Sequence, residues 1–502
     1  MAECKCFPRG SDRAWQAQYL THQDLKRLSM NPNKDSTFAY QAVYRYLVEL
    51  IEAASPEGEQ KLPSLRQLAQ RLNVSVSTTK YAYSLLEDQG RIYARPKLGY
   101  YTRAMPSALL NEGSPNLLDN VFSNARQPGM LALSIDAPAM LLSLENPLLM
   151  TERELTRQYP RSHAPLYQPF GETELRSVLA DRYTRSTRCY WRAEHVYIGS
   201  DLRSVLDLSL EALKLTGTVA LVESPCSWAI LRQLHAAKIR VIEVPLDDDG
   251  RFDLLKVQAL LQREPIALAV LSSTVNIPHG SLMPAEDKQV ICRWLAERRI
   301  WLFENDCYGE FSFVPAAARY RDFADPERLL VFSTFDKIIG SEAPYGFVLS
   351  RFQGPELHRL FLERAFRLSP IRQKAIAKLY TTRRIDQHTH MLRSMLIDRM
   401  QRMKAMLHEH TEGQLRIVAP QGGAAFWIEA TRPVNMRRVF ERLLAKRIVI
   451  APGEIFSQQG AWQHHLRLSY TIDWSKDITH ALKMLTQAIQ DEGSMAGAQL
   501  MP

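Results

Sequence analysis

The sequence predicts a protein of the α/β class, in which a small N-terminal helical module precedes a large doubly wound domain. With 502 residues the chain is too long for one ordinary domain. Short, continuous apolar runs alternate with helical patterns over most of its length, as expected for strands buried on both faces of a sheet. The apolar runs are 219–222, 266–271, 300–303 and 329–332, and the helical patterns between them include 227–237 and 284–298.

The composition is that of a globular protein with ample core material, since 46% of the residues are hydrophobic and 23% are charged. The net charge of +9 is compatible with an anionic partner, but equally with a slightly basic soluble enzyme. No apolar run is long enough to span a membrane and no signal-peptide pattern is found, so we expect a reducing, cytoplasmic location. Six cysteines do not form a disulfide framework here, and Cys4 and Cys6 lack a second Cys/His pair, so no metal site is expected.

Breaks in the pattern divide the chain into five parts. We expect a polar extension over 1–35, the helical module over 36–104, a linker rich in Pro and Gly over 105–132, the large domain over 133–492 and a tail over 493–502.

The N-terminal module begins with a helical pattern over 38–54. Two short helices follow across a tight turn: the first over 63–72 and the second over 76–89, with Ser75 as the N-cap of the second. This arrangement indicates a helix-turn-helix.

The first turn of the second helix would present small hydroxyls and a cation to a DNA major groove. These residues are Ser75, Ser77, Thr78, Thr79 and Lys80. Two alternating segments, 91–94 and 100–102, predict a β-wing whose basic turn carries Arg95 and Lys97, within reach of the DNA backbone or minor groove. By periodicity alone, a small helical subdomain with a solvated basic hairpin fits about equally well.

The segment LPSLRQLAQRLNVSVSTTKYAYSLLEDQGRIYARPKLGYYT, residues 62–102, resembles the winged helix of GntR-type bacterial repressors in spacing as well as residue type. The similarity covers most of 38–103. It implies that DNA is contacted by Arg66, Ser75, Thr78, Arg95 and Gly99. The family usually has an arginine directly after the turn serine, and Val76 at that position removes one phosphate or guanine contact.

The order of winged helix, linker and α/β domain resembles the MocR subfamily of GntR regulators. Their C-terminal domain is similar to fold type I aminotransferases, which hold pyridoxal phosphate (PLP) on a lysine. The similarity covers roughly 133–490 and lies in the segments 167–176, 223–225, 304–310, 333–337, 422–427, 451–453 and 466–468. It implies a pocket in which Lys337 forms the Schiff base, Tyr308 contacts the phenolate oxygen and Arg467 binds a carboxylate, with Thr334 and Asn276 nearby. Burial after a strand would lower the pKa of Lys337.

The same similarity shows expected cofactor contacts to be missing. Asn305 stands where the family has an aspartate against the pyridine nitrogen, although a shift by one residue would bring Asp306 there. Three further contacts are missing. Ile277 replaces the asparagine expected at the phenolate oxygen, although Asn276 directly precedes it, and Pro344 replaces the phosphate-binding arginine. Ser227, beside Trp228, replaces the aromatic residue that would stack on the ring. Since each charge-assisted contact is worth roughly 1.5–3 kcal/mol, we expect weak or absent PLP binding and no transaminase activity.

The leading hypothesis is a DNA-binding transcription regulator with an aminotransferase-like effector or dimerisation domain. It would be a homodimer that binds double-stranded DNA and an unknown small-molecule effector, without a membrane partner. Two alternatives stay open. One is a PLP-binding regulator or a PLP-dependent aminotransferase that uses Lys337, and the other is a scaffold that does not bind DNA.

Overall fold

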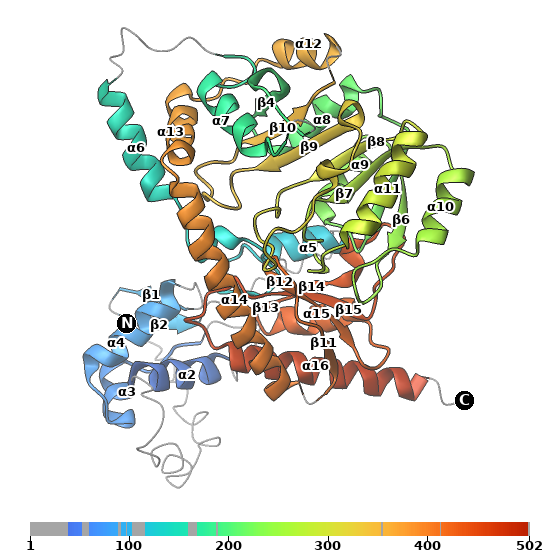
Figure 1. Ribbon diagram of the computed structural model, residues 1–502. Helices are drawn as coiled ribbons and strands as arrows, with labels where there is room; N and C mark the ends of the chain where they lie inside the picture. Colours follow the sequence, from blue (N-terminus) through green and yellow to red (C-terminus); the bar gives the residue numbers. More distant parts are fainter. Residues whose placement is uncertain are drawn as a thin grey trace, which may run out of the picture. The chain divides into compact units, whose positions relative to one another are not determined.

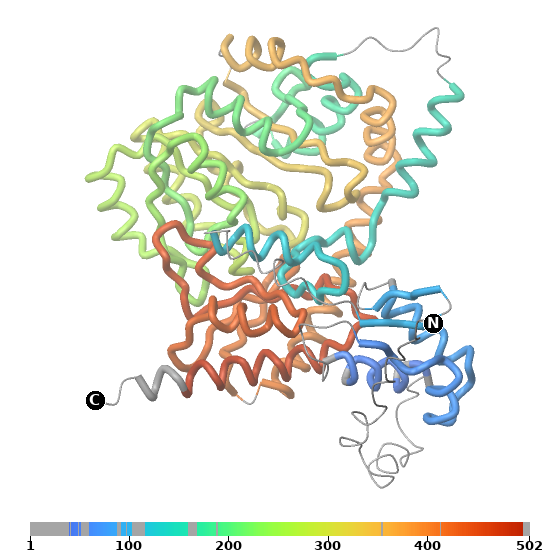
Figure 2. Tube along the Cα trace, turned by 180° about the vertical axis from the view of Figure 1, so that it is seen from behind, coloured from blue at the N-terminus to red at the C-terminus, as the bar shows by residue number. Residues whose placement is uncertain are grey.

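The computed structural model describes residues 39–52, 60–88, 92–96, 98–102, 116–158, 168–186, 189–352, 355–411 and 413–499 (Figures 1 and 2). The chain forms two compact units that divide between Leu110 and Asn111. The expected extension over 1–35 lies outside the described residues.

The described part of the smaller unit contains the helices and the hairpin that the sequence predicts. The elements are α2 (Ala39–Glu52), α3 (Leu65–Leu72), α4 (Val76–Asp88), β1 (Ile92–Arg95) and β2 (Gly99–Thr102), with β1 and β2 antiparallel. A third stretch extends the hairpin, because Leu62 N donates to Tyr100 O and Thr102 N donates to Gln60 O, each at 2.8 Å. The buried core comprises Val43, Leu47, Leu62, Leu68, Ala82, Tyr83, Leu86 and Ile92.

Local side-chain chemistry sets the helix ends in this unit. Helix α3 starts two residues later than predicted because Ser64 is its N-cap and forms a capping box with Gln67. It ends at Asn73, which adopts the left-handed conformation with φ of 52° that asparagine tolerates. The Ser75 hydroxyl then accepts a hydrogen bond from Thr78 N at 3.0 Å, as expected of the N-cap of α4.

The larger unit is built on a seven-stranded sheet with the order β4-β10-β9-β8-β7-β5-β6. The strands are β4 (Val196–Gly199), β5 (Val219–Ser224), β6 (Arg240–Pro245), β7 (Ile266–Ser272), β8 (Trp301–Asn305), β9 (Leu329–Thr334) and β10 (Gly346–Ser350). The sheet is parallel except for β10, which is antiparallel to both of its neighbours. The four predicted apolar runs are β5, β7, β8 and β9, buried at nearly every position.

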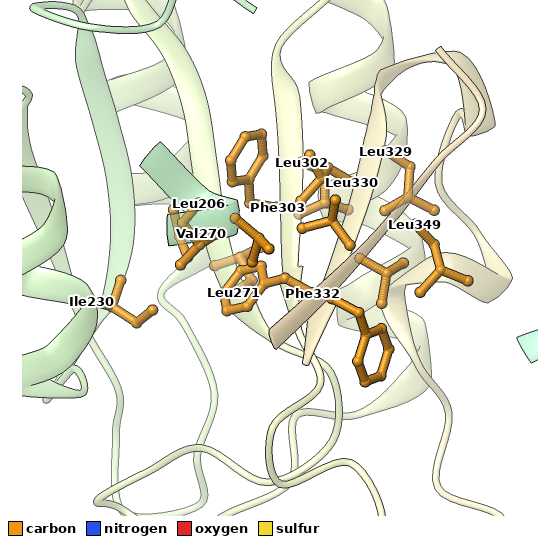
Figure 3. Close-up of a cluster of buried hydrophobic side chains, with 14 of the residues drawn as sticks. Leu206, Ile230, Val270, Leu271, Leu302, Phe303, Leu329, Leu330, Phe332 and Leu349 are labelled. Carbon is orange, nitrogen blue, oxygen red and sulfur yellow. The ribbon is translucent and has the colours of Figure 1, made fainter. Parts of the chain in front are cut away.

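Helices cover both faces of this sheet (Figures 1 and 2). They are α6 (Glu145–Gln158), α7 (Thr173–Tyr183), α8 (Leu202–Ala212), α9 (Trp228–Ala236), α10 (Leu254–Arg263), α11 (Ala285–Glu297), α12 (Pro355–Arg364) and α13 (Pro370–Thr381). Figure 3 shows part of the core, where Leu206 of α8 and Ile230 of α9 lie near Val270, Phe303 and other strand side chains. The predicted doubly wound α/β architecture is therefore confirmed.

A second subdomain of the larger unit contains an antiparallel sheet with the order β11-β12-β15-β14. The elements are β11 (Leu415–Ile417), β12 (Ala425–Ala430), β14 (Ala451–Pro452), β15 (His465–Ser469), α15 (Met436–Ala445) and α16 (Ile478–Gln499). Helix α14 (Arg384–His410) runs from the first subdomain to this one (Figure 1).

The structure corrects two expected boundaries. Residues 116–132 were assigned to a linker, but they contain α5 (Leu117–Asn124) and β3 (Leu131–Ala132). Strand β3 pairs in parallel with β13 (Ile448–Val449), and α5 buries Leu117 and Val121 in the core of the second subdomain. Three Pro- and Gly-containing breaks conceal this short helix in the sequence. The expected tail is also wrong at its start, because α16 continues to Gln499.

In the described part of the chain, no helix is long and apolar enough to cross a membrane, and no three His, Cys, Asp or Glu side chains are grouped to hold a metal ion. The four described cysteines, Cys189, Cys226, Cys292 and Cys307, are free thiols that are buried or half-buried.

Candidate functional site

The first turn of α4 carries a cluster of hydroxyls. The Ser75 hydroxyl lies 2.7 Å from the hydroxyls of both Ser77 and Thr78, so the three side chains form one hydrogen-bonded group. Ser75, Ser77 and Lys80 are exposed, and Thr78 is half-buried. Thr79 was expected on this DNA-facing surface, and that expectation is wrong. Its side chain is fully buried and its hydroxyl donates to Ser75 O. The polar surface of this turn therefore consists of three small hydroxyls and one cation.

Further exposed side chains lie on α3 and α4. Arg66 is exposed in the first turn of α3, and Val76 is exposed at the position where the GntR resemblance leads us to expect arginine. Tyr81, which the sequence reasoning did not single out, is 52% exposed on α4 and packs edge-to-face on Tyr40. An exposed aromatic ring in the first half of this helix adds an apolar contact surface to the polar one.

The β1–β2 hairpin presents Arg95 at the end of its first strand. The guanidinium is exposed and lies 5.3 Å and 4.7 Å from the ring centroids of Tyr93 and Tyr101, which hold it by cation–π contacts. Lys97, the other predicted basic residue of the turn, lies outside the described residues.

Lys61 is a basic residue of this hairpin that the sequence reasoning missed. It precedes the predicted helix and pairs with Tyr101 across the extended hairpin. Gly99 has a φ of 105°, a conformation that favours glycine, and a Cβ added there would lie 3.7 Å from Lys61 Cε. The alternation of exposed Lys61 and buried Leu62 is the sequence signal that could have revealed this third stretch.

Lys337 follows β9 in the larger unit, as the sequence predicts, but its charge state differs from the expectation. Its Nζ donates to Asp336 Oδ2 at 3.1 Å, and its side chain is 25% exposed. Burial acts to lower the pKa of Lys337, but the neighbouring carboxylates of Asp336 and Asp136 outweigh it and raise that pKa above its ordinary value. The expectation of a lowered pKa is therefore wrong, and the amine is held as an ammonium.

Arg467 and Tyr308 lie near one another in the larger unit, around Asp136. Arg467 Nη1 is 3.5 Å from Asp136 Oδ2, and its Nη2 donates to Ser134 O. The Tyr308 hydroxyl donates to the main-chain oxygen of Asp136 at 3.4 Å. Burial, followed by the Asp136 carboxylate, raises the pKa of Tyr308 far above its ordinary value. Asp136, which the sequence reasoning did not identify, is thus central to this group.

Asn305, at the end of β8, offers a neutral amide that already accepts a hydrogen bond from Cys307 N at 3.2 Å. The carboxylate of Asp306 accepts from the Tyr183 hydroxyl at 2.7 Å and from Arg321 Nη2 at 3.2 Å. Although burial acts against it, Arg321 and then Arg319 lower the pKa of Asp306 to about 2. Arg321 also binds Glu304, so Glu304 and Asp306 share one face and the intervening Asn305 lies on the other.

The remaining predicted pocket residues offer few free donors. Asn276 is buried, its Oδ1 accepts from His279 N at 3.1 Å, and its Nδ2 is one donor that has no hydrogen-bond partner. Ile277 packs on Gly423. The Thr334 hydroxyl donates to Asp336 Oδ1 at 2.7 Å. Pro344 is exposed and has no N–H to donate.

A helix N-terminus lies beside the end of β9, and a carboxylate of the chain already caps it. Gly346 pairs with Thr334, and a Cβ added to Gly346 would lie 2.5 Å from the backbone of Leu202, in the first turn of α8. Asp201 Oδ1 accepts from Ser204 N at 2.8 Å at this N-terminus. A helix N-terminus favours anions, and here that position belongs to Asp201.

Comparison with known families gives one match in each unit. Residues 39–101 match the family of bacterial regulatory proteins of the gntR family, and residues 150–485 match aminotransferase class I and II. The second match covers more than half of the chain.

The chain is also similar to proteins named as HTH-type transcriptional regulators. YdcR of Escherichia coli, named as uncharacterized, is 27% identical over 471 residues, which are 90% of this chain and 99% of the relative. NorG of Staphylococcus aureus is 22% identical over 443 residues, which are 84% of this chain and 98% of the relative.

Among solved structures, the chain resembles LysN, an α-aminoadipate aminotransferase from Thermus thermophilus, with a TM-score of 0.66 and 20% identity over 78% of this chain and 98% of the other. A multiple substrate aminotransferase from Thermococcus profundus matches with the same TM-score of 0.66 and 19% identity, over 78% of this chain and 98% of that chain. At these identities the likeness establishes the fold.

Proposed function

The chain belongs to the class I and II aminotransferase family and carries a GntR-type helix-turn-helix in front of it, and from this we propose that it is a transcription regulator that binds double-stranded DNA. The proposal rests chiefly on the exposed hydroxyl cluster of Ser75, Ser77 and Thr78 at the start of α4, with Lys80 beside it. The DNA-binding module would span 36–104, and the protein would act in the cytoplasm.

The roles of the DNA-facing residues follow from their chemistry. Small hydroxyls at a helix N-terminus bind phosphates or base edges in the major groove, because the helix end and its N–H groups attract anions. Arg66 and Lys80 would neutralise phosphates next to them. Arg95 and Lys97 would contact the backbone or the minor groove through the hairpin, where Gly99 allows close approach.

We further propose a homodimer, in which two helix-turn-helix modules bind two half-sites about one helical turn, roughly 34–36 Å, apart. The larger unit would bind a small-molecule effector that has different affinities for two arrangements of the dimer.

The larger unit would not act as an aminotransferase, because its residues do not fit PLP. Lys337 is paired with Asp336 and protonated, whereas a Schiff-base lysine must be neutral to attack an aldehyde. Pro344 offers no donor in place of the expected arginine, and Asp201 caps the N-terminus of α8, so a phosphate dianion there would face a carboxylate. Asn305 cannot stabilise a protonated pyridine nitrogen, and Asp306 is engaged by Arg321.

DNA binding is tested by fluorescence anisotropy with a labelled fragment of the DNA upstream of the protein's own gene. A dimer that contacts roughly 6–10 phosphates should lose about 10³–10⁵ in affinity between about 50 and 200 mM salt. Arg66→Ala and Lys80→Ala should each weaken binding by about five- to a hundredfold. Arg192→Ala is the matched control, because Arg192 is an equally exposed arginine of the larger unit. Absence of binding at the lower salt concentration, or equal effects of all three variants, would contradict the proposal.

The alternative of a PLP-binding regulator or a PLP-dependent transaminase is tested with the purified chain and added PLP. We expect no absorbance band near the visible edge and no amino-acid turnover. A stable band that disappears in Lys337→Ala, together with turnover, would establish the enzyme instead, whatever the result with DNA.

A further inference from the structure

The carboxylate-binding arginine of the larger unit already holds a carboxylate of the chain itself. Arg467 Nη1 lies 3.5 Å from Asp136 Oδ2, and the two side chains are only 8% and 4% exposed. We propose that Asp136 is a built-in ligand of Arg467 and that it excludes free carboxylates, including the α-carboxylate of amino acids, from this arginine. This inference goes beyond the proposed function and does not depend on DNA binding.

The contact between the two side chains is unlike that of a tight structural ion pair. Arg251 and Asp287 show the tight arrangement, with two parallel hydrogen bonds of 2.8 Å each. Asp136 and Arg467 share one contact at 3.5 Å. The two opposite charges therefore compensate each other, but both side chains keep polar atoms that could form further hydrogen bonds.

Unsatisfied polar atoms gather at this same place. Both carboxylate oxygens of Asp136, Nε of Arg467 and Oγ of Ser134 are buried without a hydrogen-bond partner. Buried polar groups are nearly always paired, by ordered water if not by protein, so such a concentration on three neighbouring residues marks a polar binding position. The carboxylate of Asp136 therefore lies beside the Arg467 guanidinium without satisfying its hydrogen bonds.

The charge around Asp136 explains why a free carboxylate would be excluded. An incoming carboxylate would have to separate Asp136 from Arg467, leaving an uncompensated charge on a buried aspartate. Lys337 could not compensate for this, because it is already paired with Asp336. Removing Asp136 should therefore turn a closed arginine into an open carboxylate receptor.

The test is chemical rescue of Asp136→Ala in the full-length chain, with sodium acetate as the probe and sodium chloride at equal ionic strength as the reference. Thermal unfolding is followed by differential scanning fluorimetry. Acetate should raise the Tm of Asp136→Ala in a saturable way, by about 2 °C at tenfold saturation, and should move the wild-type Tm by less than about 0.5 °C. Acetate should also bind the variant at least tenfold more tightly than the wild type in a calorimetric titration.

Two further variants separate this role from a general effect of acetate. Asp249→Ala removes an exposed carboxylate elsewhere in the larger unit and keeps the pair of Asp136 and Arg467, so acetate should not stabilise it. The double variant Asp136→Ala, Arg467→Ala lacks the receptor and should show no rescue. If Asp136→Ala does not fold, Asp136→Ser, which also vacates the position of the carboxylate, replaces it in the same series. Equal acetate effects in wild type and variant, or rescue that persists without Arg467, would overturn the proposal.

Discussion

Asp336 is expected to keep Lys337 protonated, and the structure allows the size of this effect to be estimated. The two charged groups are 3.1 Å apart, which corresponds to about 5 kcal/mol at an effective dielectric constant of about 20 and about 1.3 kcal/mol in bulk water. Because the side chains of Lys337 and Asp336 are 25% and 37% exposed, solvent screening moves the estimate towards the lower figure. Replacing Asp336 by Asn removes a negative charge that stabilises the ammonium, so the pKa of Lys337 should fall by about 1 unit.

This fall is measured by the rate at which acetic anhydride modifies Lys337 at a series of pH values, followed by peptide mass spectrometry. Only the neutral amine reacts, so at about pH 9 the rate should rise about tenfold in Asp336→Asn. Lys256, whose side chain is 77% exposed, serves as the internal control and should react equally in both proteins. A wild-type Lys337 that reacts as readily as Lys256 at this pH, or a rate unchanged in the variant, would refute the argument about its charge.

Three stability predictions follow from other parts of the structure, each measured by urea unfolding. Arg321→Met removes the arginine shared by two buried carboxylates and should cost about 3–5 kcal/mol. Arg240→Met breaks an exposed pair and should cost less than about 1 kcal/mol, and similar losses in both variants would contradict the role of burial. Ser64→Ala removes the capping box of α3 and should destabilise the smaller unit by about 1 kcal/mol, with unchanged stability as the contrary result. Gly346→Ala places a Cβ 2.5 Å from the backbone of α8 and should destabilise the larger unit by at least about 1–3 kcal/mol. The control is Gly493→Ala, which should be neutral or stabilising because a Cβ there meets nothing within 4 Å.

The sequence predicted the elements whose pattern of apolar residues follows directly from which of their faces are buried. Strands β5, β7, β8 and β9 are covered on both sides, so nearly every position is apolar and the runs are easy to recognise. The antiparallel direction of β10 was not predictable, because strand direction depends on how the chain returns to the sheet and not on the composition of the strand. The four-stranded sheet was equally hidden, since β14 is only two residues long.

On α4 the sequence held more information than was used. Thr79 stands three, four and seven positions before Ala82, Tyr83 and Leu86, which are all buried. At about 3.6 residues per turn these four side chains share one face, so Thr79 had to point into the core. The neighbouring Thr78 lies about 100° away around the helix and is partly accessible. Helical phase, and not residue type, therefore decides which threonine can reach DNA.

The larger unit shows why comparison with a motif identifies lost contacts more readily than added charges. Asn305 and Pro344 stand at positions where a family residue is expected, so the sequence alone could question PLP binding. Asp136 and Asp201 lie outside the segments that carry the family resemblance, and only the fold brings Asp136 to Arg467. Yet the added charge of Asp136 is expected to have the larger effect on ligand binding. A missing hydrogen bond to a charged group is worth roughly 1.5–3 kcal/mol, whereas a buried charge forced to lose its partner costs about 3–5 kcal/mol. We therefore expect Asp136 to affect ligand binding at Arg467 more strongly than any one of the missing cofactor contacts does.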